Sequence, residues 1–219
     1  MFVEQPEPGG QEHVSGLIEE GLDKLFKAEL FMVIYGFLAV LALMVAFFSA
    51  FESAKSVQDL LGSLVSTLRG FAVVESLVAL VYAYIMYQGF TALGESLDPE
   101  LVLRGKLLLA AVVAQALLTL LVWNLVDIDS LAKLAMMNIL LDLVALLAGL
   151  FWLWAYWPLG SLQPGGEVLK IGLVLRYIGL LPFGAVKILG FVGELMVLYA
   201  LYRMRNAAFT GELRETPAL

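Results

Sequence analysis

The sequence has no cysteine and a single histidine, and these two absences exclude several kinds of chemistry. Without a thiol, the chain cannot form disulfides, thiolate metal sites or iron–sulfur clusters, and it has no cysteine nucleophile. The one histidine, His13, lies in a polar N-terminal segment. Haem held by a histidine pair and a histidine proton relay within a membrane are therefore excluded. We expect no cofactor and no metal site.

Charged residues are also scarce, at 15% of the 219 residues, whereas 61% are hydrophobic. A soluble domain is usually about 25% charged and about 45–50% apolar. The apolar residues form long runs rather than helical stripes, and such runs need hydrocarbon around them. The composition therefore predicts an integral membrane protein whose main partner is the lipid bilayer.

The net charge is −7, and the acids are concentrated before residue 30. Because acidic segments repel phosphate backbones, we expect no nucleic-acid partner.

The sequence lacks a GxxxxGK[ST] phosphate loop, a His-Glu-x-x-His zinc motif and an intramembrane Ser/His pair. No segment outside the hydrophobic runs is long enough for a separate catalytic domain. We therefore expect no catalytic residues, and the chain is not predicted to be an enzyme.

The polar N-terminal part divides into two segments. Residues 1–12 contain two prolines and a Gly-Gly pair, which predicts a disordered leader. Residues 13–29 have apolar side chains at helical spacing with charges opposite, which predicts an amphipathic helix. That helix would lie at the membrane interface, pack on the bundle or dock a partner.

The fold class predicted for residues 30–205 is all-α, a polytopic transmembrane bundle of five to six spans, followed by a C-terminal tail at 206–219. A span needs about 20 apolar residues. The region after Pro164 fits either one span with an interfacial helix or a short span followed by a full one. The expected spans are 30–51, 70–93, 107–126, 134–157, 168–181 and 184–202.

The distribution of lysine and arginine favours six spans, because cytoplasmic loops carry the excess of positive charge. This arrangement predicts a multi-pass protein of the cell membrane with both termini in the cytoplasm. The inner side would hold Lys24, Lys27, Arg104, Lys106, Lys170, Arg203, Arg205 and Arg214, and the outer side Lys55, Arg69, Lys133 and Lys187.

Ionisable side chains within a bilayer are costly and suggest a functional site. Three interpretations remain open. The groups form interhelical ion pairs that fix the bundle, or they line a polar cavity that binds a cation or exchanges a proton, with Gln115 and Asn124 lining the same cavity. In the third, some of them lie near the membrane interface, Arg176 and Lys187 especially, because long basic side chains can extend to it. The intramembrane polar candidates are Glu75, Asn138, Asp142, Arg176, Lys187 and Glu194, of which Asn138 and Asp142 share a helix face.

Small residues four apart predict close helix contacts, either within the chain or between two copies. They are Ala42, Ala46 and Ala50 in the first span, Ala110 and Ala114 in the third, and Ala145 and Gly149 in the fourth.

Two short strings, Gly21-Leu22-Asp23-Lys24-Leu25 and Gly89-Phe90-Thr91-Ala92-Leu93, give the chain a weak resemblance to uncharacterised archaeal multi-pass membrane protein families. The resemblance covers little of the chain. It implies a class of protein and no activity.

Two functional hypotheses follow. The first is a non-catalytic subunit or scaffold of a membrane assembly, with a membrane-protein partner or a second copy of itself. The alternative is a small transporter or channel that uses intramembrane carboxylates for cation or proton coupling.

Overall fold

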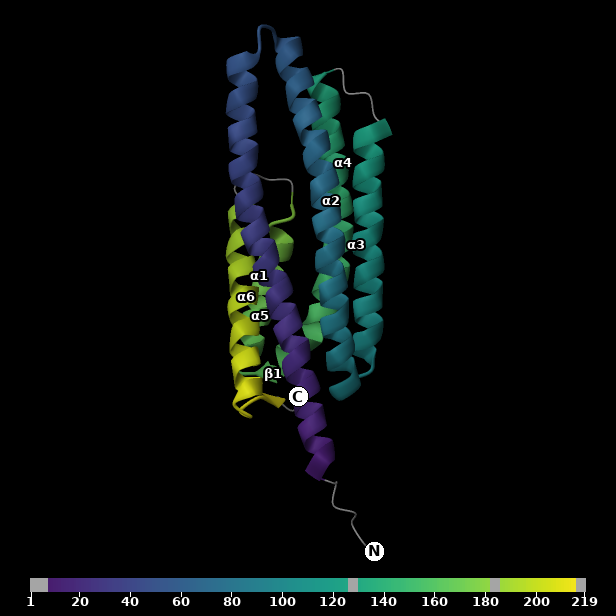
Figure 1. Ribbon diagram of the computed structural model, residues 1–219, viewed down its shortest axis with the longest axis vertical. Coiled ribbons are helices and arrows are strands. Elements are labelled where there is room, and N and C mark those ends of the chain that lie inside the picture. Colours follow the sequence, from purple (N-terminus) through teal and green to yellow (C-terminus); the bar gives the residue numbers. More distant parts are fainter. Residues whose placement is uncertain (1–7, 126–129, 182–185, 216–219) are drawn as a thin grey trace, which may run out of the picture.

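The computed structural model describes residues 8–125, 130–181 and 186–215, and these form a bundle of helices. Four long helices run side by side along the long axis of the molecule (Figure 1). They are α1 (Pro8–Ser53), α2 (Val57–Ser96), α3 (Glu100–Leu125) and α4 (Leu131–Tyr156).

The part after α4 is built from shorter elements. Helices α5 and α6 form an antiparallel hairpin beside the lower part of α1, and neither reaches the upper ends of α1 and α2 (Figure 1). Strands β1 and β2 pair antiparallel at the base of this hairpin, with Leu162 opposite Glu215. These elements are the 3-10 helix η1 (Trp157–Ser161), β1 (Leu162–Gln163), α5 (Gly166–Ile178), α6 (Lys187–Phe209) and β2 (Arg214–Glu215).

Local sequence signals set several helix ends. The Ser56 and Ser130 side chains accept hydrogen bonds from the backbone N–H groups of Asp59 and Lys133, which caps α2 and α4. Pro158 converts the end of α4 into the 3-10 turn η1. Gly165 precedes α5 with a φ of 119°, a conformation that glycine adopts without strain.

The two short strings of the weak resemblance lie against each other where α1 crosses α2. A Cβ atom at Gly21 would lie 2.9 Å from the carbonyl oxygen of Gly89, and one at Gly89 would lie 3.0 Å from that of Gly21. The neighbouring Leu25 and Phe90 are fully buried. The glycines therefore permit a close approach that brings the large side chains into one core.

The buried apolar side chains of the bundle form two clusters of different size. The lower region has a large core contributed by all six helices, which includes Leu22, Phe90, Leu108, Tyr156, Leu173 and Leu201. The upper region has a small cluster of Leu61, Val65, Ala72, Trp123 and Met137, from α2, α3 and α4.

The outside of the four long helices is apolar. In the most hydrophobic 18-residue stretch of α1 no residue is buried within the fold, and in those of α2, α3 and α4 only 17% are. By length and composition, these are the four helices among the described residues that are suited to cross a membrane.

The predicted segments map onto the helices with shifted boundaries. The segments 13–29 and 30–51 form one continuous helix, α1, which starts at Pro8 within the predicted leader. Residues 1–7 of that leader lie outside the described residues. The tail predicted from 206 includes the end of α6 and β2, and residues 216–219 again lie outside the described part.

The last two predicted spans correspond to the hairpin. Helix α5, at 13 residues, is about 20 Å long, whereas hydrocarbon is about 30 Å thick. Helix α6 starts at Lys187 and runs to Phe209, beyond the predicted end at 202. The positions 182–185 lie outside the described residues.

Candidate functional site

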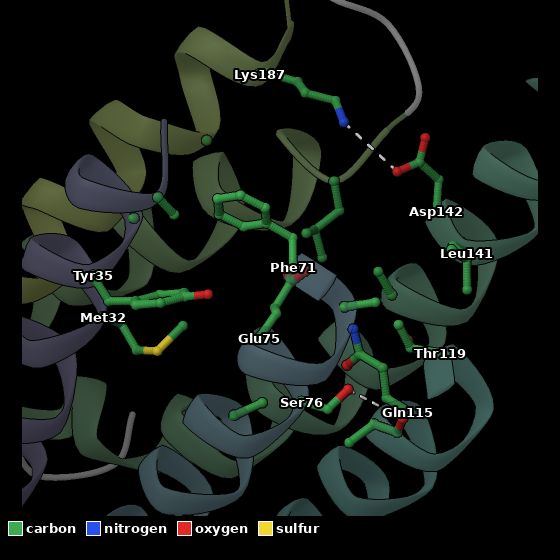
Figure 2. A pocket seen from close by; sticks show the side chains of 18 of the residues that line it. Met32, Tyr35, Phe71, Glu75, Ser76, Gln115, Thr119, Leu141, Asp142 and Lys187 are labelled. Atoms are coloured by element: carbon green, nitrogen blue, oxygen red, sulfur yellow. Dashed lines mark hydrogen bonds and ion pairs between the residues drawn. The ribbon is translucent and has the colours of Figure 1, made fainter. Parts of the chain in front are cut away.

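A cavity of about 700 Å³ lies in the bundle, with walls from α1 to α6 (Figure 2). All six side chains singled out from the sequence line it: Glu75, Asn138, Asp142, Arg176, Lys187 and Glu194. Gln115 also lines it, as expected, together with Ser76, Thr119 and Tyr35. Asn124 does not line the cavity, because its amide donates to the backbone oxygen of Leu120 at 2.7 Å on the exposed side of α3.

Glu75 lies on the α2 wall of the cavity and is exposed to the interior space. Its neighbour Ser76 is buried and donates to the backbone oxygen of Ala116, which holds α2 against α3. Tyr35 points into the cavity from α1 (Figure 2). Within the described ranges the Glu75 carboxylate has no hydrogen bond or ion pair.

Lys187 and Asp142 face each other across the cavity, from the start of α6 and from α4 (Figure 2). Their closest N–O distance is 3.6 Å, and the side chains are 58% and 31% exposed. An ion pair that is this exposed contributes little to stability. Asn138 lines the same wall one turn before Asp142, as the shared helix face predicts.

Arg176 borders the cavity but directs its guanidinium toward Glu29, whose carboxylate Oε2 accepts a hydrogen bond from it at 2.7 Å. The guanidinium also lies over the indole ring of Trp152, 4.0 Å from the ring centroid. The positive charge of Arg176 is therefore matched outside the cavity.

Glu29 is the important residue that the sequence reasoning missed. Its side chain is 0% exposed, and its Oε1 accepts hydrogen bonds from the hydroxyl groups of Tyr82 and Tyr156 at 2.7 and 2.8 Å. The Trp152 indole N–H donates to the Tyr82 hydroxyl oxygen at 3.2 Å. These contacts join α1, α2, α4 and α5, and they satisfy a buried charge that would otherwise be costly.

A signal for Glu29 exists in the sequence. Leu22, Leu25 and Glu29 follow one another at spacings of three and four, so they share a helix face. Leu22 and Leu25 are fully buried, and Glu29 is buried with them. An acid on the apolar face of an amphipathic helix, in a chain with an intramembrane arginine, indicates a buried ion pair.

Close glycine contacts hold the α5–α6 hairpin that forms part of the cavity wall. A Cβ atom at Gly172 would lie 2.9 Å from the backbone oxygen of Gly193. A Cβ at Gly193 would collide with the backbone of α5 at Arg176, and one at Gly179 with the backbone of Gly190. Close packing through small residues is common between helices in membranes. It fixes Arg176 on α5 relative to Glu194 on α6.

Some of the small residues expected to make helix contacts are buried within the bundle, and others are exposed on its surface. Gly149 of α4 packs against Tyr177 and Leu180 next to the hairpin. Ala50 of α1 is buried, whereas Ala42 is exposed. Ala110 and Ala114 are both exposed on α3.

The charge balance leaves the cavity negative. Three carboxylates and two basic groups line it, from Glu75, Asp142, Glu194, Arg176 and Lys187. Glu29 already balances Arg176, and Asp142 balances Lys187. Among the described residues, Glu75 and Glu194 are the lining carboxylates without an ion pair. The cavity therefore attracts positive charge.

Comparison with protein-family models, with curated proteins and with solved structures finds no match for this chain.

Proposed function

We propose that the chain is a multi-pass membrane protein that binds a cation in the polar cavity and moves it, or a proton, across the bilayer. The observation that carries this proposal is the cavity of about 700 Å³ lined by Glu75 and Glu194, whose carboxylates lack ion-pair partners in the described part of the chain. A purely structural role would favour carboxylates that are paired, as Glu29 is with Arg176.

The exposed apolar surface supports the membrane setting. Side chains such as Phe37, Val45 and Leu125 are 65%, 70% and 77% exposed. A soluble protein does not expose apolar area on this scale, whereas lipid covers it at no cost. Trp154, Trp157, Tyr199 and Tyr202 are exposed near the lower end of the bundle, as in an interfacial aromatic belt.

The topology that best fits these lengths is four crossing helices, α1 to α4, and a re-entrant hairpin, α5–α6. Irregular backbone within a membrane is tolerated where protein or a polar cavity surrounds it, and this hairpin packs on α1 and lines the cavity. In this topology the membrane is crossed four times instead of six. Both termini then lie on one side, as they also do in the six-span arrangement expected from the sequence. The positive-inside rule assigns that side to the cytoplasm of the cell membrane.

The function is tested by flux in reconstituted vesicles. We expect Glu75→Gln and Glu194→Gln each to reduce cation- or proton-driven flux at least about tenfold, since each removes a cavity carboxylate that forms no ion pair in the described part of the chain. Glu20→Gln is the control, because Glu20 is half exposed and pairs only with Lys24 on the same turn of α1. Full flux in both cavity variants contradicts the proposal.

A second function, a subunit or scaffold of a membrane assembly, is favoured by the exposed alanines of α3. Ala110 and Ala114 offer a small-residue face that is exposed among the helices that the structure describes. This function predicts a stoichiometric partner, or a second copy, after purification in mild detergent. Ala110→Leu should release that partner, whereas it should leave a monomeric transporter unaffected.

A further inference from the structure

An apolar groove lies beside the polar cavity, between α1, α2 and α4. Its volume is about 510 Å³. Apart from Thr67, its lining is hydrophobic: Leu43, Met44, Phe47, Phe48, Leu64, Leu68 and Leu134. Leu43 and Leu68 line both hollows, so the groove adjoins the cavity at these two side chains.

The size of the cavity argues against a bare ion as its ligand. One water molecule takes up about 30 Å³, so a metal ion in the 700 Å³ would be surrounded mostly by water rather than by protein ligands. A selective metal site also needs several converging oxygen ligands. The described residues contain no group of three or more acids or histidines that could hold one. The dimensions are those of a pocket for an organic molecule.

The two hollows differ in chemistry as the two ends of an amphiphile do. The cavity presents the carboxylates of Glu75 and Glu194 and the ring of Tyr35, which points inward (Figure 2). Carboxylates and aromatic faces are the groups that bind organic ammonium ions. The groove presents apolar side chains, with Thr67 as the single polar residue among them.

The groove also opens to the outside of the bundle. Met44, Phe47 and Phe48 line it and are 51%, 48% and 63% exposed, within the apolar stretch of α1. In a membrane this surface lies against acyl chains, so an alkyl tail can pass between lipid and groove without meeting water.

We infer that the ligand is an amphiphilic cation, with an organic ammonium head in the cavity facing Glu75 and Glu194 and an alkyl tail in the groove past Leu43 and Leu68. This inference rests on the proposed function, because it assigns a ligand to the same two carboxylates. It goes further in excluding small hydrophilic cations as the preferred ligand.

The test is equilibrium binding of two radiolabelled probes, tetramethylammonium and dodecyltrimethylammonium, to the full-length protein in maltoside micelles. Only the binding that is lost in the double variant Glu75→Gln/Glu194→Gln is counted as specific. This subtracts the probe that partitions into the micelle. We expect the dodecyl probe to bind at least about tenfold more tightly, because its tail packs against the apolar lining of the groove in addition to the contacts of the head group.

Two variants on α2 test the groove itself. Thr67→Phe fills the groove, and we expect it to weaken the dodecyl probe at least about fivefold and leave tetramethylammonium unchanged. Ser66→Phe is the matched control, because Ser66 is the preceding residue on α2, is exposed and lines neither hollow. It should change neither affinity. Thermal unfolding of both variants checks that the fold is intact.

The outcomes separate the two proposals. If both probes bind equally through the two glutamates, the amphiphile inference is overturned and the proposed cation site stands. If neither probe binds specifically, and flux also survives in both single glutamate variants, the proposed function itself fails. Dodecyl binding of equal size in the native chain and in the double variant is adventitious partitioning only, and this result overturns the inference even where flux depends on the two glutamates.

Discussion

The carboxylate of Glu29 and the guanidinium of Arg176 lie 2.7 Å apart, although 147 positions separate the two residues in the sequence. Glu29 is on the first helix and Arg176 is on the short helix α5, so this ion pair attaches the hairpin to the rest of the bundle. The tyrosine hydroxyls and the tryptophan ring around it shield both charges.

Removing one partner of this ion pair should therefore destabilise the protein strongly. We expect Glu29→Gln to lower the free energy of unfolding by about 3–5 kcal/mol, because it leaves Arg176 with an uncompensated charge. Glu20→Gln on the same helix should cost less than about 1 kcal/mol, since its pair with Lys24 is solvent-accessible. Unfolding in mixed micelles measures both. Equal effects would show that the buried pair does not fasten the hairpin.

The two tyrosines that bind Glu29 should differ in importance. Tyr156→Phe removes one hydrogen bond to the carboxylate, at a cost of about 1.5–3 kcal/mol. Tyr82→Phe removes a similar bond and also leaves the Trp152 indole N–H without its acceptor, so it should cost more. The same unfolding assay ranks them. A larger loss in Tyr156→Phe contradicts this account of the network.

A methyl group at Gly193 should force α5 and α6 apart. We expect Gly193→Ala to lower stability by about 1–3 kcal/mol, because the new Cβ meets backbone atoms that cannot give way. Gly62→Ala is the control, since nothing lies within 4 Å of its Cβ position and alanine is the better helix former. It should leave stability unchanged or raise it. Tolerance of both substitutions would show that the hairpin is loosely packed.

The Lys187–Asp142 pair should tune the cavity rather than hold the fold. Lys187→Gln frees a third carboxylate, so cation affinity should rise several-fold, whereas Asp142→Asn frees the lysine and should lower it. Both variants should unfold within about 1 kcal/mol of the native chain, because the pair is half exposed. Tetramethylammonium binding gives the affinities. Shifts of the same sign in the two variants would rule out this electrostatic role.

Cysteine labelling separates a re-entrant hairpin from two further crossings, and the native chain has no cysteine to interfere. A bulky impermeant maleimide added outside whole cells should label Ser53→Cys but not Ser96→Cys or Thr210→Cys. Ile188→Cys, at the start of α6, is 67% exposed and decides the question. It should stay unlabelled if the hairpin is re-entrant. Labelling there restores the six-span topology.

The sequence predicts the helices and the lining of the cavity well, because both depend on local properties. Hydrophobic runs delimit the helices, and any ionisable residue within such a run tends to point inward, as Glu75 and Asp142 do. Of the intramembrane candidates, Arg176 and Lys187 lie in ion pairs, whereas Glu75 forms none among the described residues.

Three features depend on contacts distant in the sequence, and the sequence reasoning did not find them. In the sequence, Glu29 resembles the other acids before residue 30. The structure distinguishes it, because α1 is continuous and the face that carries Leu22, Leu25 and Glu29 is buried. The glycines of the α5–α6 contact occur at unequal spacings, so no repeat marks them. The α5–α6 hairpin is joined to α1 by the ion pair of Arg176 with Glu29, which a count of apolar residues does not include.

The short ladder of β1 and β2 has a mechanical consequence. It joins the chain just before α5 to the chain just after α6, so the hairpin emerges from a closed base. The ladder therefore holds the two ends of the hairpin together, and α5 and α6 are attached to the rest of the bundle as one unit rather than as two separate helices.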